Sequence, residues 1–493
     1  MFQLEEIAQK IEMPKNLKKT NIVYYLIKPF AKAHIYYDGK DIIYELVEPK
    51  LTKKENEIFE NLYQGLLQLI DLSPTQIETH KKLIAHLENK IKILLKDYGY
   101  KISDKQYNKL MYFIYRDFVG LNEIEPLMHD DYVEDINCNG IKTPIYIRHR
   151  MFGNVKTNVV YKDEKRLKNF IIKLAQRCNK YITYLNPFLE GSLEDGSRVE
   201  GTISEEVCPR GPNFSIRKFR RIPFSPVELI YLKTISAKAI AYLWYLIENG
   251  ANILIIGGSG AGKTTMLNSI LTFIPSKAKI VSIEDIREIR IYHENWIATV
   301  SRESIGGLKI GEINLDKLLR ESFRENPDYV VVGEVRGKET YVMFQGMASG
   351  HPTLSTFHSE DVSSIVSRLN TPPINLPSSL IQLLDVIITV VKTEKENKII
   401  RKVKNIEELL NIDEKTKKVI TNKILTFDFS KNRFIYNANS KILEKLSINQ
   451  GIKLNEIKEE IKRREKFLLD LVKKKIFEMH RVQKEIEKYC SKL

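Results

Sequence analysis

The segment Ile253-Leu-Ile-Ile-Gly-Gly-Ser-Gly-Ala-Gly-Lys-Thr-Thr-Met-Leu267 decides how the rest of the chain is interpreted. Its four leading apolar residues predict a buried parallel strand. The pattern Gly257-x-x-x-x-Gly262-Lys263-Thr264 follows, and the residues after it predict a helix. Glycines let successive backbone N–H groups surround an anion, and a helix N-terminus adds positive potential at the same place. The segment therefore predicts a phosphate-binding loop with a nucleoside triphosphate as its ligand.

The residues of this loop have separate expected roles. Lys263 supplies a positive charge for the β- and γ-phosphates, and the Thr264 hydroxyl can ligate Mg²⁺. We therefore expect ATP and Mg²⁺ as cofactors. The predicted nucleotide-binding residues are Gly257, Gly258, Ser259, Gly260, Ala261, Gly262, Lys263, Thr264 and Thr265.

The composition indicates a globular protein with an acidic partner. The chain has 493 residues and a formal net charge of +15, which favours nucleic acid, anionic lipid or an acidic protein without choosing among them. Its four cysteines form no C-x-x-C pair, so neither a zinc site nor a disulfide framework is expected, and a reducing cytoplasm fits. No secretory signal and no membrane-spanning run are visible.

The hydrophobic pattern predicts an α/β chain. After about residue 228 helices alternate with strands, as in a parallel sheet, and the strands are expected at 252–256, 279–283, 329–332, 353–357 and 386–391. Hairpins are expected over 34–44, with a turn at Asp38-Gly39, over 133–148 and over 424–436. The predicted domains are an N-terminal extension with a hairpin and helices (1–118), a mixed α/β domain (119–222), a linker (223–230), an α/β nucleotide domain (231–437) and a helical C-terminal region (438–493).

Acidic residues follow two of the expected strands. Glu284, Asp285 and Glu288 come directly after the strand at 279–283, where a carboxylate can orient or deprotonate water, although a solvated acidic turn is the alternative. Glu334 ends the strand at 329–332 and is predicted to hold Mg²⁺. Gly333 stands where an aspartate is usual.

Histidines and arginines complete the candidate site. His351 and His358 flank the strand at 353–357 and are candidates for sensing the γ-phosphate or moving protons. Several arginines are candidates for stabilising charge in phosphoryl transfer, although each taken singly is more often a surface residue: Arg198, Arg217, Arg302, Arg320 and Arg324.

Four motifs in one order resemble the secretion ATPase superfamily, which powers type II secretion, type IV pili and the archaellum. They are the phosphate loop, Ile283-Glu-Asp-x-x-Glu288, Val332-Gly-Glu-Val-Arg-Gly337 and Gly350-His-Pro-x-x-Ser-Thr-x-His358, similar to the Walker A, Asp box, atypical Walker B and His box. Further segments resemble the archaeal branch: Leu193–Arg198, Phe214–Phe219, Phe273–Pro275, Asn295–Trp296 and Thr299–Arg302. The resemblance runs from about residue 30 to the C-terminus.

The resemblance implies a RecA-like ATPase domain and a hexamer of two-domain subunits, with ATP between the N-terminal and RecA-like domains. It implies that Glu288 activates water, that Glu334 binds Mg²⁺ and that His351 and His358 sense the nucleotide. Arg198 and Arg217 would reach the phosphates from the N-terminal domain. The implied setting is the cytoplasmic face of the cell membrane, with a polytopic platform protein and an anionic membrane surface as partners. Residues 1–100 are the expected docking surface.

Two departures and two alternatives accompany the resemblance. Asn326-Pro327-Asp328 stands where many relatives have Arg-Pro-Asp, and the tetracysteine zinc insertion of bacterial extension ATPases is absent. A RecA-like nucleic-acid translocase would fit the basic charge, but no nucleic-acid-binding motif is visible, so no nucleic-acid partner is expected. A non-hydrolysing scaffold is disfavoured because every phosphate-binding and acidic element is present.

Overall fold

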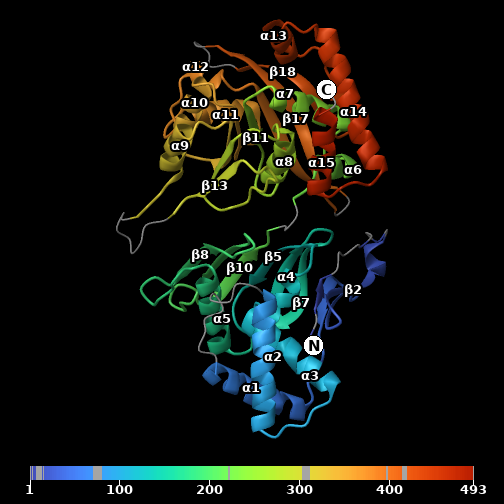
Figure 1. The fold of residues 1–493 in the computed structure, drawn as a ribbon, viewed down its shortest axis with the longest axis vertical. Coiled ribbons are helices and arrows are strands. Elements are labelled where there is room, and N and C mark those ends of the chain that lie inside the picture. Colours follow the sequence, from blue (N-terminus) through green and yellow to red (C-terminus); the bar gives the residue numbers. More distant parts are fainter. Residues whose placement is uncertain are drawn as a thin grey trace. The chain divides into compact units, whose positions relative to one another are not determined.

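The computed structural model describes residues 16–69, 80–219, 223–302, 311–395, 398–413 and 419–491, together with residues 2, 4–6, 11 and 14. The chain divides into two compact units, residues 1–220 and 221–493 (Figure 1). Each unit contains its own sheet and its own buried core, and each is described separately below.

The N-terminal unit is built on one sheet whose described strands follow the order β1-β2-β3-β4-β7-β6-β5-β10-β9-β8. All neighbours are antiparallel except β4 and β7, which run parallel. The predicted boundary at residue 118 falls inside this unit, because strands from both sides of it share the sheet. The strands are β1 (Glu5–Glu6), β2 (Asn21–Lys28), β3 (Ala31–Tyr37), β4 (Ile42–Val47), β5 (Val133–Cys138), β6 (Pro144–His149), β7 (Gly153–Val160), β8 (Phe188–Ser192), β9 (Arg198–Thr202) and β10 (Asn213–Arg217).

The hairpin expected at Asp38-Gly39 is confirmed as the antiparallel pair β3–β4. The Asp38 carboxylate accepts hydrogen bonds from the backbone N–H groups of Lys40 and Asp41, both at 2.8 Å. Gly39 has a φ of +102°, which side chains other than hydrogen rarely allow. The pair β5–β6 confirms the second expected hairpin. Turn chemistry alone was sufficient to place both.

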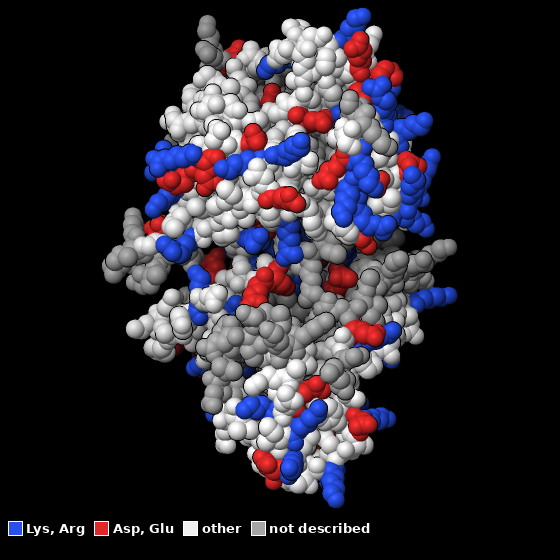
Figure 2. All heavy atoms as spheres, in the orientation of Figure 1, with Lys and Arg blue, Asp and Glu red and all other residues white. Residues whose placement is uncertain are grey.

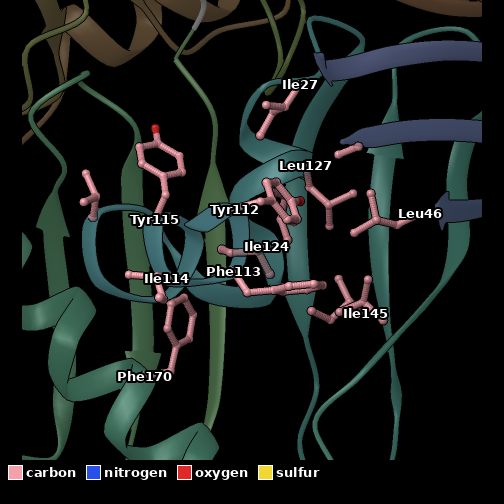
Figure 3. Packing of buried hydrophobic residues seen from close by; sticks show 14 of the residues in the cluster. Ile27, Leu46, Tyr112, Phe113, Ile114, Tyr115, Ile124, Leu127, Ile145 and Phe170 are labelled. Carbon is pink, nitrogen blue, oxygen red and sulfur yellow. The ribbon is translucent and has the colours of Figure 1, made fainter. Parts of the chain in front are cut away.

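Helices cover the buried face of this sheet. Figure 3 shows residues of this buried cluster, with Phe113 beside Ile145, Tyr112 beside Leu127 and Phe170 beside Ile114. Helices expected within residues 1–118 are present among the described residues. The helices are α1 (Lys53–Leu69), α2 (His80–Asp97), α3 (Asp104–Ile114), α4 (Glu125–Met128) and α5 (Glu164–Arg177), with short helical turns at η1 (Leu17–Lys19), η3 (Tyr115–Val119) and η4 (Asn122–Ile124).

The C-terminal unit contains a mixed sheet in the order β13-β12-β14-β15-β11-β16-β17-β18-β19. The strands from β13 to β16 are parallel, and those from β16 to β19 are antiparallel. All five strands expected for the nucleotide domain are present, as is the hairpin at 424–436. The strands are β11 (Ile253–Ile256), β12 (Ile280–Glu284), β13 (Trp296–Val300), β14 (Tyr329–Val335), β15 (Thr353–Phe357), β16 (Val386–Lys395), β17 (Lys398–Ile412), β18 (Val419–Asp428) and β19 (Arg433–Tyr436).

Both faces of the central strand β11 are covered, so its four residues are all apolar and buried. Ile253 and Ile255 point into one core, which the helices α7, α8, α14 and α15 complete, whereas Leu254 and Ile256 point into the other, with α9, α10 and α11. The helices are α6 (Pro226–Tyr231), α7 (Ala237–Glu248), α8 (Lys263–Ile270), α9 (Leu315–Arg324), α10 (Glu339–Ala348), α11 (Val362–Asn370), α12 (Ser378–Ile381), α13 (Lys441–Gln450), α14 (Leu454–Lys473) and α15 (Met479–Cys490), with a short turn η5 (Leu271–Phe273).

The predicted linker (223–230) and the predicted C-terminal region (438–493) both contain helices. Most of the predicted linker is the helix α6, because Ser225 caps it through the backbone N–H of Glu228 at 3.1 Å and Pro226 suits its first turn. The helices expected after residue 438 are confirmed, and they pack onto the core of the C-terminal unit. Among the described helices, none combines the length and the apolar character needed to span a membrane.

A buried arginine ties α14 to the nucleotide domain. The Arg464 side chain is 3% exposed, and its guanidinium lies 2.6 Å from Glu248, 2.9 Å from Glu460 and 4.7 Å from the centre of the Trp244 ring. Arg464→Ala should lower the free energy of unfolding by about 3–5 kcal/mol, because it removes a buried guanidinium that pairs with Glu248 and Glu460 and packs on the Trp244 ring. Chemical denaturation measures this change.

The neighbouring Arg463 is a matched control, because it pairs with the same Glu460 at 2.7 Å while its side chain is 64% exposed. Arg463→Ala should change the free energy of unfolding by only about 0–1 kcal/mol. Equal losses for the two variants would contradict the assignment of Arg464 as the tie.

Candidate nucleotide-binding site

The predicted phosphate loop lies between β11 and α8, with backbone angles that require glycine. Gly260 and Gly262 have φ values of +66° and +100°. A Cβ at Gly257 would come 2.3 Å from the Val390 carbonyl oxygen of β16, so no side chain fits there. Ser259 and Gly260 are exposed at the tip of the loop. The loop therefore has the turn and the open N–H groups that a phosphate needs.

Lys263 begins the helix after the loop. Its Nζ lies 3.3 Å from the Gly258 carbonyl oxygen and 3.8 Å from Glu334 Oε1. Burial lowers the pKa of Lys263, while the charges of Glu334 and Glu288 oppose that shift. Thr264 and Thr265 follow in the first turn of α8 and are partly exposed. The structure thus brings the predicted phosphate-binding cation and two predicted carboxylates together.

The strand order explains why Glu334 meets the loop. β14, β15 and β11 are successive neighbours in the sheet, so their carboxyl ends lie at one edge. Glu334 also accepts a hydrogen bond from Arg336 Nε at 3.0 Å. Asp328 lies at the opposite end of β14, where it accepts from the backbone N–H of Lys279 at 2.7 Å, as its position before the strand predicts.

The acidic segment after β12 is held close to α8. Asn268 of α8 donates to the Glu288 carbonyl oxygen at 3.0 Å and accepts from the Arg290 N–H at 2.9 Å. Glu284 is buried at the end of β12, whereas Asp285 is exposed and accepts a hydrogen bond from Ser301 Oγ at 3.0 Å. Of the three acids, Glu288 therefore combines partial exposure with a fixed place near Lys263.

The structure separates the two predicted histidines. β15 pairs in register with β11, so His358 follows Phe357 at the level of Gly257, whereas His351 precedes the strand. The five-residue strand between them spans about 16 Å. Within its own subunit His351 therefore lies at the strand end away from the loop, where its ring packs 5.2 Å from that of Phe323, and its role as a sensor stays a prediction. His358 is exposed at the correct end.

The arginines are dispersed. Arg302 follows β13, which lies four strands from β11, about 19 Å at ordinary strand spacing, and its Nε donates to the Gly311 carbonyl oxygen at 2.8 Å. Arg320 and Arg324 form exposed ion pairs within α9. Arg198 and Arg217 are opposite one another on β9 and β10 of the N-terminal unit. Their role at the phosphates stays a prediction, as does that of Arg302.

One residue at the loop had no sequence signal. Arg401 of β17 donates through Nε to the Gly260 carbonyl oxygen at 2.9 Å, and its Cδ would be 3.7 Å from a Cβ at Gly262. These contacts join residues 141 positions apart in the sequence, so only the sheet order reveals them. Arg401 supports the loop from the antiparallel half of the sheet.

The donor set fits Mg·ATP rather than a metal held by protein alone. Within the described ranges, no three His, Cys, Asp or Glu side chains form a cluster that would hold a metal. One threonine hydroxyl and one carboxylate beside a phosphate loop are what Mg²⁺ uses when phosphate oxygens and water complete its shell.

A parallel sheet with this loop and these strand-end acids defines a P-loop nucleoside triphosphatase. Residues 203–424 match the family model described as "Type II/IV secretion system protein". The uncharacterized protein MJ0900 of Methanocaldococcus jannaschii is 33% identical over 492 residues, covering 95% of this chain and 89% of that protein. The chain belongs to the type II/IV secretion system protein family. The predictions of the superfamily and of an ATPase are thereby confirmed.

More distant similarities extend to bacteria. The conjugal transfer protein TrbB of Rhizobium radiobacter is 29% identical over 233 residues, covering 45% of this chain and 68% of that protein. Among solved structures, the Legionella pneumophila ATPase DotB is 17% identical, covers 76% of this chain and 95% of its own, and has a TM-score of 0.42.

Proposed function

We propose that this ATPase is a cytoplasmic homo-hexamer that works at the inner face of the cell membrane. It powers the assembly of a type IV pilus-like filament, or type II-like secretion, through a polytopic membrane platform protein. The observation that carries the proposal is the meeting of Lys263 and Glu334, 3.8 Å apart, at the phosphate loop of a chain from this family. That arrangement suits phosphoryl transfer, in which positioning and charge stabilisation supply most of the catalysis.

The side chains divide the work of hydrolysis. The loop N–H groups and Lys263 hold the phosphates, and Thr264 and Glu334 would hold Mg²⁺, which when bound neutralises charge on the β- and γ-phosphates. Glu288 orients the attacking water and accepts its proton. Arg198, Arg217 and Arg302 would stabilise the transferring phosphoryl group, and His358 would sense it.

Stimulation of ATPase activity distinguishes this function from that of a nucleic-acid translocase. Both functions fit a net charge of +15, but they differ in the acidic surface that activates the motor. Phosphate release should rise when vesicles containing anionic lipid are added and should not respond to double- or single-stranded DNA. Stimulation by DNA and not by vesicles would support the translocase instead.

The outer surface of α2 suits a membrane interface. Lys92 and Lys96 are exposed beside Ile93 and Tyr98, whose large apolar side chains are 51% and 45% exposed. Lysines attract anionic headgroups, and apolar and aromatic side chains can enter the interface. This part of the N-terminal unit, within residues 1–100, is therefore the proposed docking surface. Substitutions on α2 test docking better than a deletion at the start of the chain. Such a deletion would also disturb the core, because β2 contributes the buried Leu26 and Ile27 to it.

Lys92→Glu with Lys96→Glu should weaken binding to anionic vesicles by about 30-fold or more, since each well-placed lysine contributes about 1 kcal/mol. Vesicle co-sedimentation measures this, and basal ATPase activity should persist. The control is Lys462→Glu with Lys466→Glu on α14, in the region of α14 and α15 where Figure 2 shows Lys and Arg gathered. A larger loss of binding in the control would move the docking surface to α14.

A further inference from the structure

A second glutamate lies behind the predicted water activator. Glu284, the last residue of β12, is 2% exposed, and its Oε1 accepts hydrogen bonds from the backbone N–H groups of Glu288 and Ile289, both at 2.7 Å. Its Oε2 has no hydrogen-bond partner in the part of the chain that the structure describes. One carboxylate oxygen thus fixes the backbone at the residue expected to handle water.

The neighbouring strand leaves room for this side chain. A Cβ at Gly333 of β14 would come 3.1 Å from Glu284 Cγ and 3.4 Å from its Oε1. Thr356 of β15 donates to the Gly333 carbonyl oxygen at 2.7 Å and holds that position in the sheet. This packing gives a physical reason for glycine where an aspartate was expected, because any larger residue would crowd Glu284.

The segment containing Glu288 is anchored on two sides. Glu284 holds the N–H groups of residues 288 and 289, while Asn268 of α8 holds the carbonyl of Glu288 and the N–H of Arg290. Asn268 lies on the helix that begins with Lys263. The two anchors, one on β12 and one on α8, therefore fix the Glu288 backbone relative to the phosphate loop.

We propose that Glu284 is a positioning residue for ATP hydrolysis: it holds the Glu288 backbone so that the Glu288 carboxylate faces the attacking water. The proposal rests on the proposed role of Glu288 in that reaction. Glu284 does not touch the phosphates in this arrangement, and its effect passes through the backbone of Glu288. A displacement of about 1 Å at such a group can reduce turnover by about 10²-fold.

A contribution to folding stability would not explain why a glutamate is buried at position 284. Burial raises the pKa of its carboxyl to about 7, with Glu288 adding to the shift and Arg287 opposing it, while β14 presents the uncharged Gly333 on the other side. A folded pKa above the unfolded value of about 4.3 means that the stabilising contribution is complete below pH 4.3 and is lost as pH rises through 7. Glu284→Gln should therefore be at least as stable as the wild type at pH 8.

The test compares Glu284→Ala and Glu284→Gln with Glu294→Gln, which changes an exposed carboxylate further along the same segment. Glu284→Ala should reduce kcat by about 10²-fold and leave the Kd for Mg·ATP within about twofold, because only positioning is lost. Glu284→Gln keeps a carbonyl oxygen for the two N–H groups, so kcat should fall by only about fivefold. Glu294→Gln should resemble the wild type in kcat and Kd.

Amide hydrogen exchange, measured without nucleotide, tests the contact independently of activity. Glu284→Ala should lose protection at Glu288 and Ile289 by about tenfold or more, while the rest of the C-terminal unit stays protected. Unchanged exchange there, or a kcat within about twofold of wild type, would overturn the proposal. Loss of protection across the whole unit in both Glu284 variants would also overturn it, in favour of a purely structural role. ATP turnover by the wild-type protein itself is a separate test, which bears on the proposed function.

Discussion

Lys263→Ala is expected to reduce ATP turnover at least about 10³-fold, because removing even one preorganised neutral hydrogen-bond donor from an active site costs about 10²–10³-fold, and Lys263 supplies a full charge. Lys263 is the loop's ammonium, and its partners in the structure are the Gly258 carbonyl and Glu334. Without it, Glu334 faces the phosphates with no cation from the loop between them. Nucleotide affinity should fall as well, since the lost contact is made in both the ground state and the transition state.

Steady-state phosphate release measures this effect. Lys277→Ala is the matched control, because Lys277 is exposed in the turn after α8 and belongs to the same unit. The control should retain wild-type turnover. Near-wild-type turnover in Lys263→Ala would show that the loop does not bind the phosphates as described.

Glu288→Gln and Glu334→Gln should both lose turnover, by about 10²–10⁴-fold for the loss of a general base at Glu288, but through different steps. Glu288→Gln should still bind Mg·ATP with near-wild-type affinity, because the phosphate and metal contacts remain. Glu334→Gln should lose most of the gain in affinity that Mg²⁺ provides, because the metal's carboxylate ligand is gone. Its affinity for ATP without Mg²⁺ should hold or rise, since a negative charge 3.8 Å from Lys263 has been removed.

Nucleotide affinity measured with and without Mg²⁺ distinguishes the two variants, each serving as the control for the other. The ratio of the two affinities should be wild-type in Glu288→Gln and close to one in Glu334→Gln. Identical ratios in both variants would count against the assigned roles. The reverse pattern would exchange them, making Glu288 the metal ligand.

Local signals in the sequence were enough to predict the strands of the nucleotide domain and the phosphate loop. The run Ile253–Ile256 is apolar on both faces because two helical layers cover it, and the glycines after it need backbone angles or space that other residues lack. The Asp38-Gly39 turn was predictable for a similar reason, since Asp38 binds its own neighbours. The turn contacts and backbone angles are local, whereas the covering helices and the Val390 carbonyl beside Gly257 come from distant parts of the chain.

Several contacts that depend on strand order were not predictable from local patterns. Glu284 meets Gly333 only because β12 and β14 are neighbours, and Arg401 meets Gly260 only because β17 lies two strands from β11. The sequence suggests that His351 and His358 act as a pair. They lie at the two ends of β15, however, and only the end with His358 faces the loop. Sequence patterns place residues on elements, whereas the sheet order decides which elements share an edge.

Phosphate release by the purified full-length chain, measured with ATP in the presence and absence of Mg²⁺ and of anionic vesicles, tests the ATP-driven motor most directly. The expected result is turnover that requires Mg²⁺, rises with vesicles and disappears in Lys263→Ala. No turnover under any of these conditions, or turnover that Lys263→Ala leaves unchanged, would contradict the assignment of this site as an ATPase.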